Sequence, residues 1–169
     1  MPHSTTSTED PLALENQVCY ALAVAARNVI GLYRPILDPL GLTHPQYLVM
    51  LALWEQSPRS LRGLASALSL EPATLSPLLR RLEAAGHLRR ERNAADERML
   101  DITLTETGQA LRAAAETIPP RVAAALDMSV AELEELREVL HRVISASARS
   151  SSVGSTSSSS ASVSEPAVR

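Results

Sequence analysis

The sequence contains no lysine and no phenylalanine, and its 169 residues include a single cysteine. One cysteine excludes an intrachain disulfide and a cysteine-rich zinc site. Aromatic residues make up only 2% of the chain, so leucine, valine and alanine must form most of the core, which favours helices. No apolar run approaches the roughly 20 residues of a membrane span. The polar first ten residues do not resemble a secretory signal peptide, and we expect a soluble, cytoplasmic protein.

The charged residues are unevenly distributed along the chain. All 16 basic residues are arginines, and the formal net charge is −3. Residues 59–98 nevertheless hold eight of these arginines and only five of the 19 acidic residues. An acidic body with one basic segment favours electrostatic steering of that segment to phosphate groups.

Two short amphipathic helices are predicted inside this basic segment. Both have apolar residues at the i, i+3, i+4, i+7 spacing that buries one face of a helix. The two sets are Leu61, Leu64, Ala65 and Leu68, and then Leu75, Leu78, Leu79 and Leu82 before a stop at Gly86. Residues 88–92 and 100–104 are then predicted to form two strands joined by a polar turn at 93–96. This order predicts a winged helix-turn-helix over about 60–105 in a mainly α (α+β) fold.

The second helix carries hydrogen-bonding and guanidinium groups on the face opposite its leucines. Such a helix fits the major groove of double-stranded DNA. The predicted DNA contacts on this helix are Thr74, Ser76, Arg80 and Arg81. The predicted phosphate contacts on the first wing strand are Arg89, Arg90 and Arg92. Arg98 is predicted to enter a minor groove, with Asp96 orienting it through an ion pair.

Further helices are predicted on both sides of the winged module. A helix over Pro11–Arg34 should kink or end at Pro35 and Pro39. Thr43 and Gln46 form the pattern of a capping box for a helix that runs to about Gln56. The residues that this helix is predicted to bury are Tyr47, Leu48, Leu51 and Trp54. Helix resumes after Thr105, is interrupted at Pro119 and Pro120, and begins again with a capping box of Ser129 and Glu132.

The predicted domain covers residues 11–146, with dimerisation helices over about 11–40 and 106–146. The apolar stripes at 14–32 and 133–144 must pack on each other or on a second copy of the chain. A two-fold homodimer would place two recognition helices at the half-sites of an inverted repeat. Residues 1–10 are predicted to form a disordered arm. Residues 147–169 are predicted to form a disordered tail, because serine supplies 12 of the last 25 residues.

Cys19 is the only thiol of the chain. A lone cysteine on an apolar helix is usually an inert core residue, whereas reactivity requires nearby hydrogen-bond donors or positive charge. The three tyrosines and the tryptophan all fall between residues 20 and 54, and His44 would supply a proton acceptor or, when protonated, a cation. Tyr33 lies fourteen residues after Cys19, or about 21 Å along a continuous helix. A contact between the two therefore requires a second subunit.

Several segments between residues 11 and 145 match one known pattern. They are Leu-Glu-Asn-Gln-Val-Cys at 14–19, Leu-Tyr-Arg-Pro at 32–35, Pro-Gln-Tyr-Leu-Val-Met at 45–50, the helix at 71–82 and Asp-Glu-Arg at 96–98. With them the chain resembles the multiple antibiotic resistance regulator (MarR) family of dimeric bacterial repressors, and within it the one-cysteine branch that senses organic hydroperoxides. The resemblance implies that Cys19 is the oxidisable switch and that Tyr33 and Tyr47 stand near the sulfur. Ala23 and His44 depart from it, since the family pattern has tyrosines there.

These observations lead to a DNA-binding repressor that releases its operator when an organic hydroperoxide oxidises Cys19. The predicted sensor pocket contains Tyr33, His44 and Tyr47. Thiolate attack on the peroxide gives a sulfenic acid. Without a second cysteine in the chain, the next step involves an outside low-molecular-weight thiol, the other subunit or overoxidation.

Two other classes of function remain at this stage. A regulator of the same fold would release DNA on binding a small phenolic or lipophilic ligand, without cysteine chemistry. An enzyme is the third class, and the sequence offers no nucleophile–base pairing, phosphate loop or metal-binding cluster to support it. We therefore expect no catalysis, cofactor or metal, and no membrane partner.

Overall fold

The structure is a computed structural model that describes residues 10–93, 96 and 98–154. Residues 1–9 of the predicted arm at 1–10, part of the wing turn and the tail beyond 154 lie outside the described residues. The chain divides between Val122 and Ala123 into two compact units, which are described separately. This division falls inside the segment 106–146 that was predicted to form the second dimerisation region.

The first long helix begins later than its apolar pattern predicted. A short 3-10 helix, η1 (Leu14–Asn16), precedes α1 (Val18–Leu37), so the predicted helix over Pro11–Arg34 was wrong at both ends. Gln17 is extended (φ −86°, ψ 113°) and its Nε2 donates a 2.6 Å hydrogen bond to the carbonyl of Pro11, which keeps the preceding turn separate. Pro35 lies inside α1. A second 3-10 helix, η2 (Asp38–Leu40), ends at Gly41 with φ +67°.

Helix α2 (His44–Glu55) begins as predicted. The backbone N–H and the hydroxyl of Thr43 both donate to Oε1 of Gln46 at 2.9 Å, which confirms the capping box. The predicted burial of Leu48 and Leu51 was wrong, because these side chains are 37% and 41% exposed, and Trp54 is only half-buried. Most residues of α2 are apolar, so its periodicity selects no unique face, and packing against α1 and α4 decides which side is buried. The buried residues are Gln46, Tyr47, Val49, Met50, Ala52 and Leu53.

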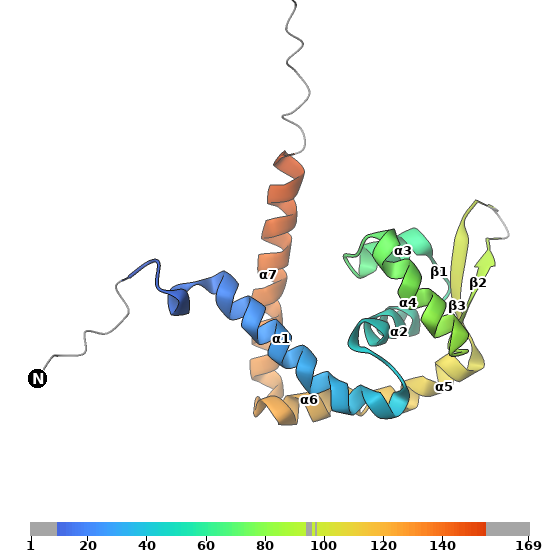
Figure 1. Cartoon of the computed structure of the whole chain (residues 1–169), viewed down its shortest axis with the longest axis horizontal. Coiled ribbons are helices and arrows are strands. Elements are labelled where there is room, and N and C mark those ends of the chain that lie inside the picture. Colours follow the sequence, from blue (N-terminus) through green and yellow to red (C-terminus); the bar gives the residue numbers. More distant parts are fainter. Residues whose placement is uncertain (1–9, 94–95, 97, 155–169) are drawn as a thin grey trace, which may run out of the picture. The chain divides into compact units, whose positions relative to one another are not determined.

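The two predicted helices of the basic segment are present. They are α3 (Leu61–Ala67) and α4 (Pro72–Ala84), and Figure 1 shows both beside α2 and the β2–β3 hairpin. The Ser60 hydroxyl accepts a 3.0 Å hydrogen bond from the Gly63 N–H and so caps α3. The side chains that are at most 1% exposed in these helices are Leu64, Leu75, Leu79 and Leu82. Gly86 follows α4 with φ +79°, the left-handed conformation that ends many helices.

The wing consists of β2 (Leu88–Arg92) and β3 (Leu100–Leu104), which pair antiparallel as predicted. Leu88 and Ile102 are at most 2% exposed and attach the hairpin to the core. A two-residue strand that the sequence did not predict, β1 (Arg59–Ser60), pairs with the other edge of β3 and gives the order β1–β3–β2. A strand of two residues is too short to show alternation.

Helices α5 (Glu106–Ala115) and α6 (Ile118–Leu126) follow the wing. The Thr105 hydroxyl caps α5 by accepting from the Gly108 N–H at 3.1 Å. Gly108 is required by close packing, because a Cβ there would lie 1.9 Å from the carbonyl oxygen of His87. The predicted interruption at Pro119 and Pro120 was placed too late, because the break falls at residues 116–117. Both prolines stand in the first turn of α6, where proline is tolerated.

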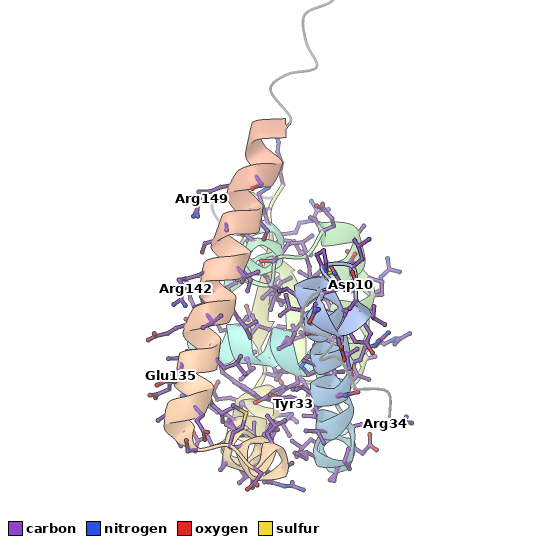
Figure 2. All side chains as sticks on the ribbon, turned by 90° about the vertical axis from the view of Figure 1, so that its left-hand side faces the viewer. Asp10, Tyr33, Arg34, Glu135, Arg142 and Arg149 are labelled. Atoms are coloured by element: carbon purple, nitrogen blue, oxygen red, sulfur yellow. The ribbon has the colours of Figure 1, made fainter. Side chains whose placement is uncertain are left out.

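The second unit contains α7 (Val130–Gly154). Ser129 and Glu132 form the predicted capping box, with the Ser129 N–H donating to Glu132 Oε2 at 2.8 Å. The helix continues beyond residue 146, so the prediction of a disordered tail from 147 was wrong as far as Gly154. The Ser150 hydroxyl donates to the carbonyl of Ala146, a local bond that serine can make without leaving the helix. Figure 2 shows Glu135, Arg142 and Arg149 along one side of α7.

Candidate nucleic-acid interface and cysteine site

Helix α4 presents the polar face that the sequence predicted. Thr74, Arg80 and Arg81 are exposed and Ser76 is half-buried, while the leucines of the same helix face the core. Neither Arg80 nor Arg81 belongs to an ion pair among the described residues. The Ser76 hydroxyl donates a 2.9 Å hydrogen bond to the carbonyl of Pro72, so its oxygen can still accept a hydrogen bond from a bound molecule.

Arg90 does not extend from the wing as a free phosphate contact. Its guanidinium forms an ion pair with the carboxylate of Glu83 in α4, and its backbone N–H donates to the same carboxylate at 3.1 Å. The hydrogen bond from the Arg90 side chain is the main reason why the pKa of Glu83 is lowered from its usual value of 4.5. In this structure Arg90 therefore connects β2 to α4.

The remaining wing arginines differ in their contacts. Arg89 Nε lies 3.2 Å from Glu91 Oε2 in an exposed ion pair, and Arg92 and Arg98 are exposed. The predicted ion pair between Asp96 and Arg98 was wrong among the described residues. Asp96 Oδ1 instead accepts a 3.0 Å hydrogen bond from the backbone N–H of Arg98, so the carboxylate shapes the turn and does not hold the guanidinium.

A cleft of about 730 Å³ separates the start of α3 from the wing. Arg62 and Arg98 line it from opposite sides, together with Ser60, Ser66 and Met99. Arg62 belongs to the basic segment at 59–98, but no role was predicted for it. Arg62 lies in the first turn of a helix that Ser60 caps, and this position was the only sequence feature that could have indicated a role at the cleft.

Cys19 is exposed and occupies the second position of α1. In the first turn of a helix several backbone N–H groups have no intrahelical partner. Because its side chain is exposed, Cys19 is not a core residue of this chain. Helix α1 runs unbroken from Cys19 to Tyr33, which puts the two about 21 Å apart along the axis at ~1.5 Å per residue.

The other predicted sensor residues do come together, away from Cys19 in the same chain. The centroid of the Tyr33 ring lies 4.8 Å from the centroid of the His44 ring and 5.9 Å from that of the Tyr47 ring. The centroid of the Tyr47 ring in turn lies 6.4 Å from that of Trp54. Trp54 was predicted only to be buried, not to belong to the sensor pocket. Tyr33 and Arg34 leave α1 on different sides in Figure 2.

Burial sets the protonation of this aromatic cluster. It raises the pKa of Tyr33 and lowers the pKa of His44. It also raises the pKa of Tyr47, and repulsion from Tyr33 raises it further. Near neutral pH the tyrosine hydroxyls therefore remain hydrogen-bond donors, and His44 is favoured as a neutral proton acceptor over the cationic form.

No group of three or more metal-ligating side chains occurs among residues 10–93, 96 and 98–154. Within the same residues, no helix has the length and apolar character needed to cross a membrane.

Comparison with known proteins identifies the family. A family model described as transcriptional regulator SarA/Rot matches residues 31–114. The organic hydroperoxide resistance transcriptional regulator of Bacillus subtilis is 36% identical over 80% of this chain and 92% of its own length. The transcriptional regulator TtmR of Methylorubrum extorquens is 40% identical over 82% of this chain and 74% of its own. The chain belongs to the MarR/SarA family of winged-helix transcriptional regulators.

Solved structures agree with this assignment. Reduced AbfR bound to DNA superimposes with a TM-score of 0.70 at 34% identity, over 80% of this regulator and 93% of that chain. AbfR, from Staphylococcus epidermidis, also has a DNA-bound overoxidised structure and a disulfide-formed structure. Bordetella bronchiseptica BpsR, whose DNA binding is regulated by 6-hydroxynicotinic acid, gives a TM-score of 0.68 at 25% identity over 79% of this chain and 97% of its own. The chain is accordingly a DNA-binding transcriptional regulator.

Proposed function

We propose that this regulator is a repressor that releases an inverted-repeat operator when an organic hydroperoxide oxidises Cys19. The observation that carries the proposal is the exposure of Cys19, the only thiol of the chain, in the first turn of α1. The similarity to the B. subtilis hydroperoxide resistance regulator and to AbfR, which has reduced and oxidised structures, supports it.

DNA recognition in this proposal uses the exposed face of α4. Thr74 and Ser76 lie toward its beginning, and Arg80 and Arg81 follow in the next turns. Arginine reads guanine edges or binds phosphate, and short hydroxyl side chains bind either. Arg92, Arg98 and Arg62 add positive charge beside the cleft between α3 and the wing.

The chemical step transfers one oxygen atom. The thiolate of Cys19 attacks the peroxide oxygen distal to the organic group, forming an S–O bond as the O–O bond breaks. The leaving alkoxide takes a proton and departs as the alcohol, and the sulfur becomes a sulfenic acid. A second thiol, from a low-molecular-weight thiol or from Cys19 of another subunit, would then give a disulfide and water.

A homodimer fits the uncovered apolar surface of α1. Val18, Tyr20 and Ile30 are 71%, 42% and 45% exposed in the single chain. Pairing of α1 with a second copy would bury these side chains and bring Tyr33 of one chain toward Cys19 of the other. The dimer would couple the state of the sulfur to the spacing of two recognition helices, which must enter successive grooves together. Sedimentation of the reduced protein at micromolar concentration should give the mass of a dimer, and a monomer that still binds the full site tightly would contradict this.

A second function, regulation by a small phenolic or lipophilic ligand without cysteine chemistry, is favoured by one observation. A pocket of about 390 Å³ lies between α2 and α5, lined by Tyr47, Leu51 and Trp54 together with Arg112 and Glu116. This volume and its mainly apolar lining suit a small ligand. BpsR, which responds to 6-hydroxynicotinic acid, shares the fold.

One titration separates the two functions. The probe is the duplex that the reduced protein selects from a random-sequence library, and its binding is followed by fluorescence anisotropy. One equivalent of cumene hydroperoxide should release the duplex, and a thiol reductant should restore binding. Because the overoxidised form of AbfR is described bound to DNA, mass spectrometry should record the sulfur product in the same sample. Continued binding with Cys19 oxidised would favour the ligand-regulated function.

A further inference from the structure

A row of aromatic rings leads from α1 along α2 in the first unit. The centroid of the Tyr33 ring lies 5.9 Å from that of Tyr47, which lies 6.4 Å from that of Trp54. Rings at these separations are in direct contact. Tyr33, Tyr47 and Trp54 therefore form one continuous row of contacting rings.

Trp54 joins this row to α5. Its indole Nε1 donates a 2.9 Å hydrogen bond to the carbonyl oxygen of Gly108. The acceptor belongs to a residue that has no free space beside its Cα. A Cβ on Gly108 would lie 1.9 Å from the carbonyl oxygen of His87 and 2.9 Å from its carbonyl carbon. The backbone of α5 is therefore packed directly on the segment that follows α4.

That segment is hydrogen-bonded on both sides. The His87 N–H donates a 3.0 Å hydrogen bond to the carbonyl of Leu82, the last buried leucine of α4. The Thr105 hydroxyl donates a 2.6 Å hydrogen bond to the carbonyl of Gly86, and the Thr105 N–H donates one of 3.1 Å to the carbonyl of His87. Because Thr105 is also the cap of α5, these bonds connect the start of α5 to the carboxyl end of α4.

We propose that Trp54 is a positioning residue for DNA binding. Through Gly108 it holds the carboxyl end of α4 at the angle at which the recognition helix fits the groove, and it transmits displacements of the aromatic row to that helix. The idea that oxidation of Cys19 causes such a displacement rests on the proposed function. The positioning role itself applies to the reduced protein.

The substitution Trp54→Phe tests this role, because it keeps a ring in the row and removes the N–H donor. Affinity for the selected duplex should be measured at a temperature where circular dichroism shows the variant fully folded. We expect Kd to rise about two- to tenfold, the range that one ordinary hydrogen bond provides. The salt dependence of Kd should be unchanged, because no phosphate contact is lost.

The control is Thr117→Val, which removes an exposed 2.8 Å hydrogen bond to the carbonyl of Ala114 after α5. It should bind like wild type. If Trp54 only stabilises the fold, Trp54→Phe will lower the melting temperature and leave Kd unchanged, and this result would overturn the proposal.

Transmission has a separate readout, because Trp54 is the only tryptophan of the chain. One equivalent of cumene hydroperoxide should shift the indole emission of the wild type and leave that of Cys19→Ser unchanged. Release of DNA with unchanged emission would overturn transmission through Trp54. If the hydroperoxide releases no DNA from the wild type, the redox function fails, whereas the Kd of Trp54→Phe still decides the positioning role.

Discussion

Glu83 and Arg90 connect α4 to β2, the first strand of the wing. Arg90 donates to the two carboxylate oxygens of Glu83 from its backbone N–H and from its side chain, with Nε at 2.8 Å from Oε2. Both side chains are about one third exposed. Two donors from one residue on one carboxylate fix the angle between α4 and β2 better than a single contact would.

Glu83→Gln should lower the melting temperature at pH 7 by a few degrees, the scale of about 1 kcal/mol in a domain of this size. Because the pKa of Glu83 is lowered in the folded state, the stabilisation by the charged pair is complete above the ordinary value of 4.5. It is lost as the pH falls through the lower folded pKa. The difference between the two proteins should therefore shrink in thermal scans below pH 4.5.

The matched control is Glu91→Gln, which breaks the exposed pair of Glu91 with Arg89 at 3.2 Å. Exposed pairs contribute little to stability, so this variant should melt close to wild type. An equal loss in both variants would mean that the pair of Glu83 and Arg90 has no special structural role.

Arg80→Ala and Arg81→Ala should each weaken DNA binding. If the side chain binds a phosphate, the slope of log K against log [salt] should fall by about one unit. If it reads a base edge, discrimination at one base pair should relax by roughly 1–3 kcal/mol. Arg137→Ala in α7, where the arginine is also exposed, is the control and should bind like wild type. Wild-type affinity in both α4 variants would rule out α4 as the recognition helix.

Gly108→Ala should destabilise the protein strongly. The added methyl group would overlap the backbone of His87, and overpacking of this kind costs about 1–3 kcal/mol or more. Gly31→Ala in α1 is the matched control, because nothing lies within 4 Å of its Cβ position. It should be neutral or stabilising by up to about 1 kcal/mol. Urea unfolding measures both, and equal stability of the two variants would contradict the close packing of α5 on His87.

Tyr33→Phe should reduce the response to hydroperoxide without abolishing DNA binding. Burial raises the pKa of Tyr33, so its hydroxyl is a donor at neutral pH and would support a thiolate on the partner chain. The dose of cumene hydroperoxide that releases half of the duplex should increase. An unchanged dose would exclude the hydroxyl of Tyr33 from the sensor.

The winged module was predictable because its signals are local. The leucine spacing of α3 and α4 leaves one apolar face each, and the alternation of β3 places Ile102 inside. The burial of α2 was not predictable in the same way. This helix is apolar on most sides, so its periodicity does not distinguish the exposed Leu48 from the buried Leu53. The partner of Arg90 was also beyond the sequence, because Glu83 meets it only once a helix and a strand have packed together.

The most direct test of the redox proposal compares Cys19→Ser with wild type. Serine is close to cysteine in size, and Cys19 is exposed in the single chain, so the reduced proteins should bind the selected duplex with equal affinity. Both are then given one equivalent of cumene hydroperoxide while anisotropy reports the bound fraction. The wild type should release the duplex and recover it with reductant, and Cys19→Ser should stay bound throughout. Release from Cys19→Ser at the same dose as from wild type would contradict a redox switch at this residue.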